Sequence, residues 1–539
     1  MRMINCLLFF SFLLFQPVVG YNYLVFCPLF GHSHTTFFAK IADTLTDAGH
    51  NVTFLTPTIV EEFESKEYVK STKHVVKLKA SENVRQFDIA LKSTGIHKFW
   101  HLDSSLSEVL PTLRLFQQMF VSLAENMYEN IEVLEDLKNN YHYDAIIYEC
   151  FVFTAFPVMD YLGIKTQIPA ISLTHDTMIS KAIGEPVMPS AVSEKMSPFD
   201  DRMTLGQRMI NTIFHPSIVL YLGGPVYTTF TQPRTQINIE ALQHHSAYFL
   251  INSNPYLDFP RPTITKTVQI GGISVNLEKM RAEKVDKTWD KILNIRPHNM
   301  LVSFGSVQRS EFMPDTYKAA IIEAMSKFPN VTFIWKYESD SHHLFNVKNL
   351  TNVHFEKWVP QRALLVDSRI DAFFTHAGLG SVNEVSYSGK PAILCPLFVD
   401  QMRNAKMLAR HQGAIEYSKF DLDNSPKIEH VMRQILFNTE YTKNAQNLAK
   451  RLERQPIKPD QLLVKHCEFA AEFGELESLD PYSLSIDSIQ AYNMLKIENV
   501  AIKYLYAPMF LHRLRIRTKH SVAYQMSSGV LLNLERVLR

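Results

Sequence analysis

Residues 373–401 carry polar and glycine residues whose types and spacing could bind a charged ligand. Their pattern predicts a strand end, a tight turn over 375–381 and a helix over 382–388 that Gly389 would cap. A helix that begins behind a glycine-containing turn presents free backbone N–H groups and the positive end of its dipole. Such a turn suits a phosphate group, although glycine can also serve chain geometry alone.

Polar side chains accompany this turn at regular intervals. His376 and Ser381 can donate hydrogen bonds to a phosphate, and Glu384 lies one helical turn further along. Its carboxylate could accept hydrogen bonds from sugar hydroxyls. Asp400 and Gln401 open the next predicted helix. The residue types therefore suit a ligand that carries both phosphate and sugar.

The spacing continues a longer pattern: W-x-P-Q at 358–361, T-H-x-G-x-x-S-x-x-E at 375–384, G-x-P at 389–391 and P-L-F-x-D-Q at 396–401. This set closely resembles the donor-binding signature of the UDP-glycosyltransferases, in the branch that includes animal UDP-glucuronosyltransferases. The resemblance runs from about Tyr21 to about Tyr482. It implies an α/β fold in which two Rossmann-like domains face each other across a cleft, the GT-B type.

The resemblance also implies a role for each donor-site residue. Trp358 would stack on the uracil, and Gln361 would bond the edge of that base or the ribose. Glu384 would accept from the ribose hydroxyls, while Asp400 and Gln401 would hold hydroxyls of the transferred sugar. The diphosphate would be held by Ser306, His376, Gly378 and Ser381.

Glycosyl transfer also needs a base that removes the proton from the acceptor hydroxyl. We choose His34, on the loop after the first predicted strand, because its place matches the register of the family's catalytic histidine; His32 is the alternative. The family pairs this histidine with an Asp that follows a later strand. The matching position here is Glu149, which keeps the charge and adds a methylene. Glu149 could instead be a strand-end carboxylate paired with a surface lysine.

The resemblance implies an inverting transfer of a glucuronosyl or glucosyl group to a hydroxyl of a small lipophilic acceptor, as in detoxification of xenobiotics or steroids. UDP-glucuronic acid or UDP-glucose would be the co-substrate, and no cofactor is expected. The acidic residues form no compact cluster along the chain, and the helix terminus with His376 could do the work of a cation. We therefore expect no metal.

Two successive α/β patterns would position these residues, with Pro260 and Pro262 near the division between them. The first opens with a strand at 23–27 and a helix that Thr35 or Thr36 would cap. We predict a signal peptide at 1–20, an acceptor-binding domain at 21–262, a UDP-sugar-binding domain at 263–455, a helix crossing back at 456–485 and an atypical tail at 486–539.

The ends of the chain bear on its location. Residues 1–20 combine a basic start, an apolar core and a small-residue exit, which predicts a signal peptide and entry to the endoplasmic reticulum lumen. Asn51, Asn330 and Asn349 stand in glycosylation sequons. Charged residues interrupt every candidate membrane span in the tail, so we expect no spanning helix; peripheral membrane association and homo-oligomerisation stay open.

Other function classes fit less well. The 539-residue chain has a formal net charge of +1, without the basic excess of a nucleic-acid-binding protein. A dinucleotide-dependent dehydrogenase would need G-x-G-x-x-G between a strand and a helix, and neither α/β pattern has it. A non-catalytic lumenal binder of small apolar ligands, with a degenerate donor site, is the remaining alternative. The departures at Glu149 and Gly380, where relatives usually carry Asp and Asn, and the unusual tail keep this alternative open.

Overall fold

The computed structural model describes residues 20–94, 100–101, 106–152, 154–175, 177–195, 197–212, 245–306, 308–340 and 350–484. The predicted signal peptide, the sequon at Asn349 and the tail from residue 486 lie outside the described residues. The chain divides into two compact units, residues 1–479 and 480–539. The first unit contains both β-sheets, and the second contains the described 3-10 helix Tyr482–Leu484.

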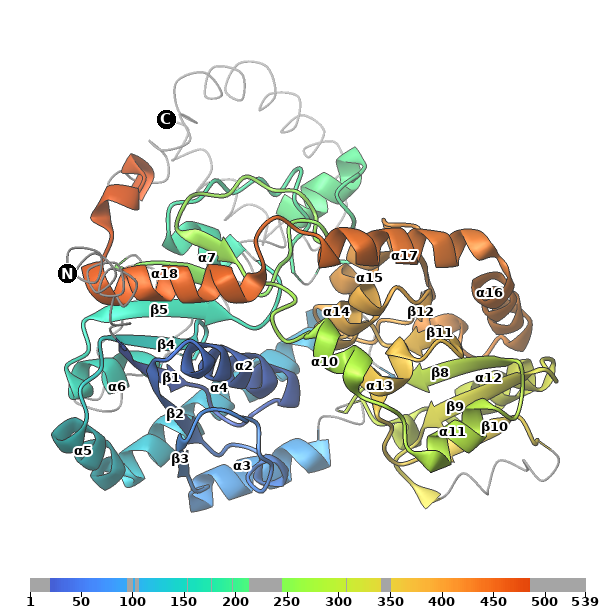
Figure 1. Cartoon of the computed structure of the whole chain (residues 1–539), viewed down its shortest axis with the longest axis horizontal. Helices are drawn as coiled ribbons and strands as arrows, with labels where there is room; N and C mark the ends of the chain where they lie inside the picture. The colour runs from blue at the N-terminus through green and yellow to red at the C-terminus, as the bar shows by residue number, and fades with distance from the viewer. Residues whose placement is uncertain are drawn as a thin grey trace, which may run out of the picture. The chain divides into compact units, whose positions relative to one another are not determined.

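A parallel sheet of seven strands forms the first half of this unit (Figure 1). The strand order is β3-β2-β1-β4-β5-β6-β7, so the order reverses direction between β1 and β4. In doubly wound sheets, the carboxyl ends of the strands at such a reversal are where ligands bind. The strands are β1 (Asn22–Phe26), β2 (Asn51–Pro57), β3 (His74–Leu78), β4 (Ala145–Glu149), β5 (Thr166–Ile171), β6 (Phe249–Ile251) and β7 (Thr267–Gln269).

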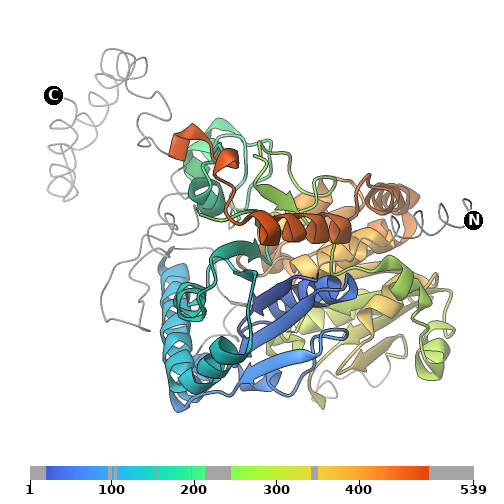
Figure 2. The same ribbon diagram turned by 60° about the vertical axis from the view of Figure 1, so that its left-hand side comes forward.

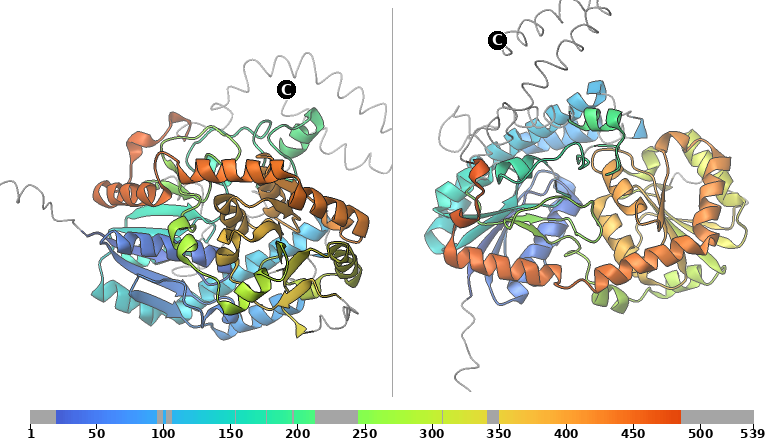
Figure 3. Two further views of the ribbon diagram at one scale, coloured as in Figure 1. Left: turned by 45° about the vertical axis from the view of Figure 1, so that its right-hand side comes forward. Right: turned by 90° about the horizontal axis from the view of Figure 1, so that it is seen from above.

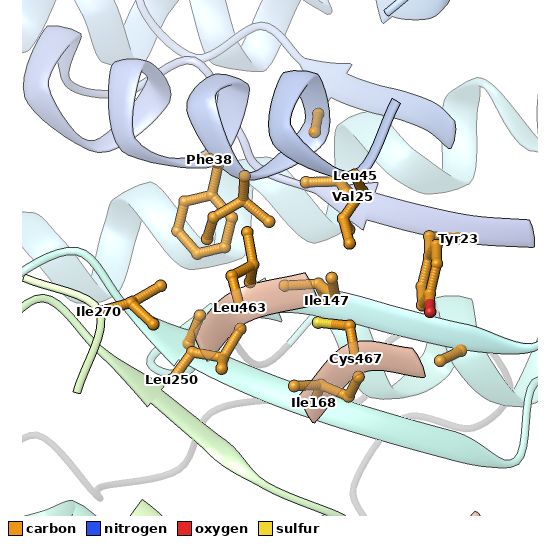
Figure 4. Packing of buried hydrophobic residues seen from close by; sticks show 14 of the residues in the cluster. Tyr23, Val25, Phe38, Leu45, Ile147, Ile168, Leu250, Ile270, Leu463 and Cys467 are labelled. Carbon is orange, nitrogen blue, oxygen red and sulfur yellow. The ribbon is translucent and has the colours of Figure 1, made fainter. Parts of the chain in front are cut away.

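Helices cover both faces of the first sheet, because successive strand residues point to opposite sides. Val25 and Ile147 pack on one face with α2 (His32–Asp47) and α18 (Pro459–Phe473), as Figure 4 shows at close range. The other face packs against α4, α5 and α6 (Figure 2). Further helices of this half are α3 (Glu82–Thr94), α4 (Leu106–Glu129), α5 (Ile131–Asn140), α6 (Ala155–Leu162) and α7 (Thr177–Ala182).

A second parallel sheet has six strands in the order β10-β9-β8-β11-β12-β13, and its order reverses between β8 and β11. The strands are β8 (His298–Ser303), β9 (Val331–Lys336), β10 (Val353–Glu356), β11 (Ile370–Thr375), β12 (Ala392–Leu394) and β13 (Ala414–Glu416). The helices are α10 (Leu277–Ala282), α11 (Lys287–Leu293), α12 (Asp315–Ser326), α13 (Gln361–Val366), α14 (Leu379–Ser388), α15 (Gln401–Ala409), α16 (Ser425–Phe437) and α17 (Thr439–Glu453).

The two sheets confirm the predicted pair of Rossmann-like domains, with one difference at their division. The predicted boundary after Pro262 falls between β6 and β7, because β7 pairs with β6 and completes the first sheet. The prolines at 260 and 262 therefore lie in a connection within the first domain. After α17 the chain crosses back, and α18 packs against α2, β5 and β7 (Figure 3).

Among the buried contacts that join the two domains, two involve large side chains. Trp100 lies in the core of the second domain, where its indole N–H donates to the carbonyl of Arg309 at 3.1 Å. On α15, the fully buried Arg403 pairs with Asp258 at 2.8 Å. Burial by itself would raise the pKa of Asp258, but Arg403 and a hydrogen bond from Ser253 bring that pKa below its ordinary value. Asp258 therefore carries a charge that depends on Arg403.

We expect Arg403→Ala to destabilise the fold strongly. Removing one partner of a buried ion pair leaves the other charge uncompensated, which costs about 3–5 kcal/mol. Thermal unfolding of the variant should show a lower Tm. The exposed pair of Lys443 and Glu440 offers a control, because Lys443→Ala should have little effect on Tm. Equal Tm values for the two variants would contradict this assignment.

Candidate functional site

His34 lies on the first turn of α2, which begins at His32 behind the extended residue Gly31. We had predicted a loop here, with Thr35 or Thr36 as the helix cap. The helix starts earlier, at His32, so both threonines lie inside it and their hydroxyls donate to the carbonyls of Gly31 and His32 at 3.1 and 2.7 Å. His34 is therefore held by regular helical backbone, with the carboxyl end of β1 beside it.

Glu149 is the last residue of β4, and its side chain is fully buried. The Nδ1 atom of His34 lies 3.0 Å from the Oε2 atom of Glu149. β1 and β4 are the neighbours between which the strand order reverses, so the fold brings these two residues together at the expected edge of the sheet. The carboxylate pairs with His34 and not with a surface lysine.

Ser172 also belongs to this cluster, and sequence reasoning missed it. It follows β5 directly, next to β4 in the sheet, and its hydroxyl lies 2.5 Å from both Glu149 Oε2 and His34 Nδ1. Its one signal is its position directly after a strand, where functional residues of such sheets often lie.

The alternative base, His32, faces a different neighbour. Its Nδ1 atom lies 3.4 Å from the hydroxyl of Tyr68. Burial lowers the pKa of His32, and the charges of Lys66 and Arg362 lower that pKa further. Its surroundings thus disfavour the imidazolium that a base must become.

In the second domain, the carboxyl ends of neighbouring strands carry the predicted donor residues. Ser306, which is exposed, follows β8; Trp358, which is 64% exposed, follows β10; and His376 follows β11. Lys336, at the end of β9, was missed by sequence reasoning. Its ammonium donates to the carbonyl of Gly305 at 2.8 Å and lies 5.7 Å from the ring centre of Trp358. Its only signal was its position at the end of a strand.

The ring of His376 fits between two glycines. A Cβ atom on Gly305 would come within 2.6 Å of this ring, and one on Gly378 within 2.5 Å, so only glycine fits at either position. Burial lowers the pKa of His376 to about 4, with a further contribution from the charge of Lys336. The imidazole is thus neutral near pH 7 and offers an N–H group. A positive charge is also close by, on the ammonium of Lys336.

The helices α13 and α14 are joined by the side chain of Gln361. Its amide donates to Ser381 Oγ at 3.1 Å and to Glu384 Oε2 at 2.7 Å. Burial raises the pKa of Glu384, and the hydrogen bond from Gln361 opposes that shift. Three of the predicted donor residues therefore form one cluster beside the N-terminus of α14, which Gly378 caps.

Asp400 and Gln401 stand at the start of α15. The Asp400 carboxylate accepts a hydrogen bond from the Asn404 side-chain amide at 2.7 Å. The side-chain oxygen Oε1 of Gln401 accepts from the backbone N–H groups of Leu397 and Phe398. Burial raises the pKa of Asp400; Asn404, His34 and Lys195 act in the opposite direction. The charge of a protonated His34 in the first domain would therefore act on Asp400 of the second.

Comparison with known proteins shows the family to which this chain belongs. The sequence profile described as "UDP-glucoronosyl and UDP-glucosyl transferase" matches residues 24–473. The chain belongs to this family. It is a UDP-glycosyltransferase, whose donor is a UDP-sugar and which needs no cofactor besides that donor.

Relatives of this enzyme cover most of its length at modest identity. The Caenorhabditis elegans protein ugt-48 is 26% identical over 476 residues, which cover 86% of this chain and 88% of that protein. UDP-glucuronosyltransferase 1A9 of Mus musculus is 23% identical over 468 residues, covering 86% of this chain and 85% of the mouse protein.

Solved structures show the same fold. Phytolacca americana UGT2, in complex with UDP-2fluoro-glucose and pterostilbene, has a TM-score of 0.55 at 15% identity and covers 84% of this chain and 100% of its own. Os79 of O. sativa, in complex with U2F and trichothecene, has a TM-score of 0.56 at 16% identity with the same coverage. These similarities confirm the predicted GT-B fold.

Two further observations concern metals and membranes. Among the residues that the structure describes, no group of three or more His, Cys, Asp or Glu side chains is placed to hold a metal ion. Within the same residues, no helix is both long and apolar enough to cross a membrane.

Proposed function

We propose that this enzyme transfers a glucuronosyl or glucosyl group from a UDP-sugar to a hydroxyl of a small lipophilic acceptor, with inversion at the anomeric carbon. The observation that carries the proposal is the contact of His34 with Glu149 at 3.0 Å, close to Asp400 of the donor-binding domain. A buried carboxylate beside a histidine orients the ring and stabilises its protonated form. Such a pair next to a sugar-nucleotide site suits removal of a hydroxyl proton.

In the proposed reaction, Nε2 of His34 takes the proton of the acceptor hydroxyl as its oxygen attacks the anomeric carbon. The bond between that carbon and the diphosphate oxygen breaks, and its electron pair leaves with UDP. Glu149 stabilises the imidazolium, since its charge lies 3.0 Å from Nδ1. Attack from the side opposite the leaving diphosphate inverts the configuration.

For the donor, we infer that Trp358 stacks on the uracil, because an exposed indole offers a free face. The carboxylate of Glu384 would accept hydrogen bonds from the ribose hydroxyls while it also accepts one from the Gln361 amide. The N-terminus of α14 would stabilise the diphosphate as it leaves, with a further contribution from the ammonium of Lys336, which also pairs with Glu338 at 2.8 Å. Asp400 and Gln401 would hold the sugar near His34.

The first domain would therefore bind the acceptor and the second the donor, in the lumen of the endoplasmic reticulum. Turnover should be measured with UDP-glucuronic acid and with UDP-glucose, each against a panel of phenols and steroids, with product configuration read by NMR. We expect one donor to be preferred and the β-configured product from an α-linked donor. Retention of configuration, or donor binding without transfer to any hydroxyl acceptor, would contradict the proposal.

Trp358→Ala should weaken UDP binding by about 1–3 kcal/mol, the size expected when a base loses its stacking partner. Isothermal titration with UDP measures this directly. Phe420 is also exposed, at 53%, in the same domain, so Phe420→Ala serves as the control and should bind UDP as the unmodified enzyme does. Unchanged UDP affinity in Trp358→Ala would place the uracil elsewhere.

A further inference from the structure

Ser172 makes contacts with both members of the proposed catalytic pair. Its backbone N–H donates to Glu149 Oε1 at 3.2 Å, and its hydroxyl lies 2.5 Å from Glu149 Oε2 and 2.5 Å from His34 Nδ1. The residue is itself fixed, because the Asn252 amide donates to its carbonyl at 2.8 Å and its own exposure is 6%. One serine thus holds both carboxylate oxygens and touches the ring.

The protons in this cluster can be assigned from the chemistry of each atom. An ionised carboxylate only accepts, so the hydroxyl proton of Ser172 points to Glu149 Oε2. The serine oxygen then presents a lone pair to His34 Nδ1, as does the carboxylate oxygen at 3.0 Å. Two acceptors at one nitrogen require a proton on it. Nδ1 is therefore protonated in the neutral ring, and the free lone pair is on Nε2.

We propose that Ser172 is a positioning residue, which fixes Glu149 and selects the His34 tautomer whose Nε2 atom accepts the acceptor proton. This inference rests on the proposed role of His34 as the base. A positioning role for Ser172 also suits the presence of Glu149 where relatives usually carry Asp. Glu149 is one methylene longer than Asp and is free to adopt more rotamers, and the two bonds from Ser172 restrict its carboxylate to one of them.

The test compares Ser172→Ala with Ser172→Thr, which keeps the hydroxyl. We expect Ser172→Ala to lower kcat by about 10- to 100-fold, the effect of losing one hydrogen bond to a charged group. KM for the UDP-sugar should stay unchanged, because Ser172 lies in the other domain from Trp358 and Glu384. Ser172→Thr should recover most of the rate.

A matched control removes a similar hydroxyl away from the site. Thr72 Oγ1 donates to the buried carboxylate of Asp43 at 3.1 Å, so Thr72→Val loses the same kind of bond. Its kcat should equal that of the unmodified enzyme. A full kcat in Ser172→Ala, or the same loss in Thr72→Val, would overturn the proposal.

A second measurement does not depend on turnover. With ¹⁵N-labelled histidine, the ring signals of His34, identified by their loss in His34→Gln, report which nitrogen carries the proton. We expect the Nδ1–H tautomer in the unmodified enzyme and a mixture of tautomers in Ser172→Ala. An Nε2–H tautomer in the unmodified enzyme would overturn the role of Ser172. If His34→Ala instead keeps full activity, the proposed function of His34 fails, whatever the tautomer.

Discussion

His34→Ala is expected to lower kcat by about 10²–10⁴-fold, the usual cost of losing a general base. UDP should bind the variant as tightly as it binds the unmodified enzyme, because the proposed uracil, ribose and diphosphate contacts all belong to the second domain. Steady-state kinetics and titration with UDP measure the two quantities separately. A loss of kcat alone would mark His34 as a residue of the chemical step.

The control for this variant is a histidine in a similar pair on the surface. His142 is 84% exposed and lies 3.4 Å from Asp144, so His142→Ala should leave kcat unchanged. His32→Ala tests the alternative base. If His32→Ala abolishes turnover while His34→Ala keeps it, the base has been assigned to the wrong histidine.

Glu149→Gln is expected to cost about 10²–10⁴-fold in kcat. The amide has nearly the shape of the acid, but it cannot stabilise an imidazolium, and the corresponding change in a hydrolase triad costs about 10⁴-fold. The amide N–H₂ can also face His34 Nδ1, which favours the unproductive tautomer. Kinetics with the preferred donor at saturating acceptor measure the effect.

Combined variants show whether the pair acts as a unit. His34→Ala with Glu149→Gln should be little slower than His34→Ala alone, because groups that act together are not additive. Glu149→Asp keeps the charge and should be faster than Glu149→Gln. Glu468, on α18, lies 3.5 Å from His50, and Glu468→Gln supplies the control. Full activity of Glu149→Gln would show that the acid has another role.

Much of the fold could be predicted because local patterns decide it. The strand predicted over 23–27 is β1 (Asn22–Phe26), and Gly389 caps α14 with the positive φ of 70° that glycine adopts readily. The last two strands of the first sheet were harder, since β6 and β7 have only three residues each and prolines between them. Only the pairing in the sheet shows that these prolines lie inside the first domain.

The sequence predicted the site residues that belong to a motif. It did not predict the residues that only the pairing of strands brings to the site. The motif residues Gln361, Ser381 and Glu384 form one hydrogen-bonded cluster. Ser172 and Lys336 have no motif; they join the site because β4 lies next to β5 and β8 next to β9.

Ionisation is a further property that the sequence does not give. The neutral state of His376 follows from its burial between Gly305 and Gly378, so it depends on the packing of three separate segments.

The most direct test of the account is the dependence of kcat on the acidity of the acceptor, measured for the unmodified enzyme and His34→Ala with a series of substituted phenols. A base matters most when the acceptor holds its proton tightly and least when the acceptor is already ionised. The account predicts that the ratio of the two kcat values is large for weakly acidic phenols and approaches one for phenols that ionise below the assay pH. A ratio that stays constant across the series would contradict the assignment of His34 as the base.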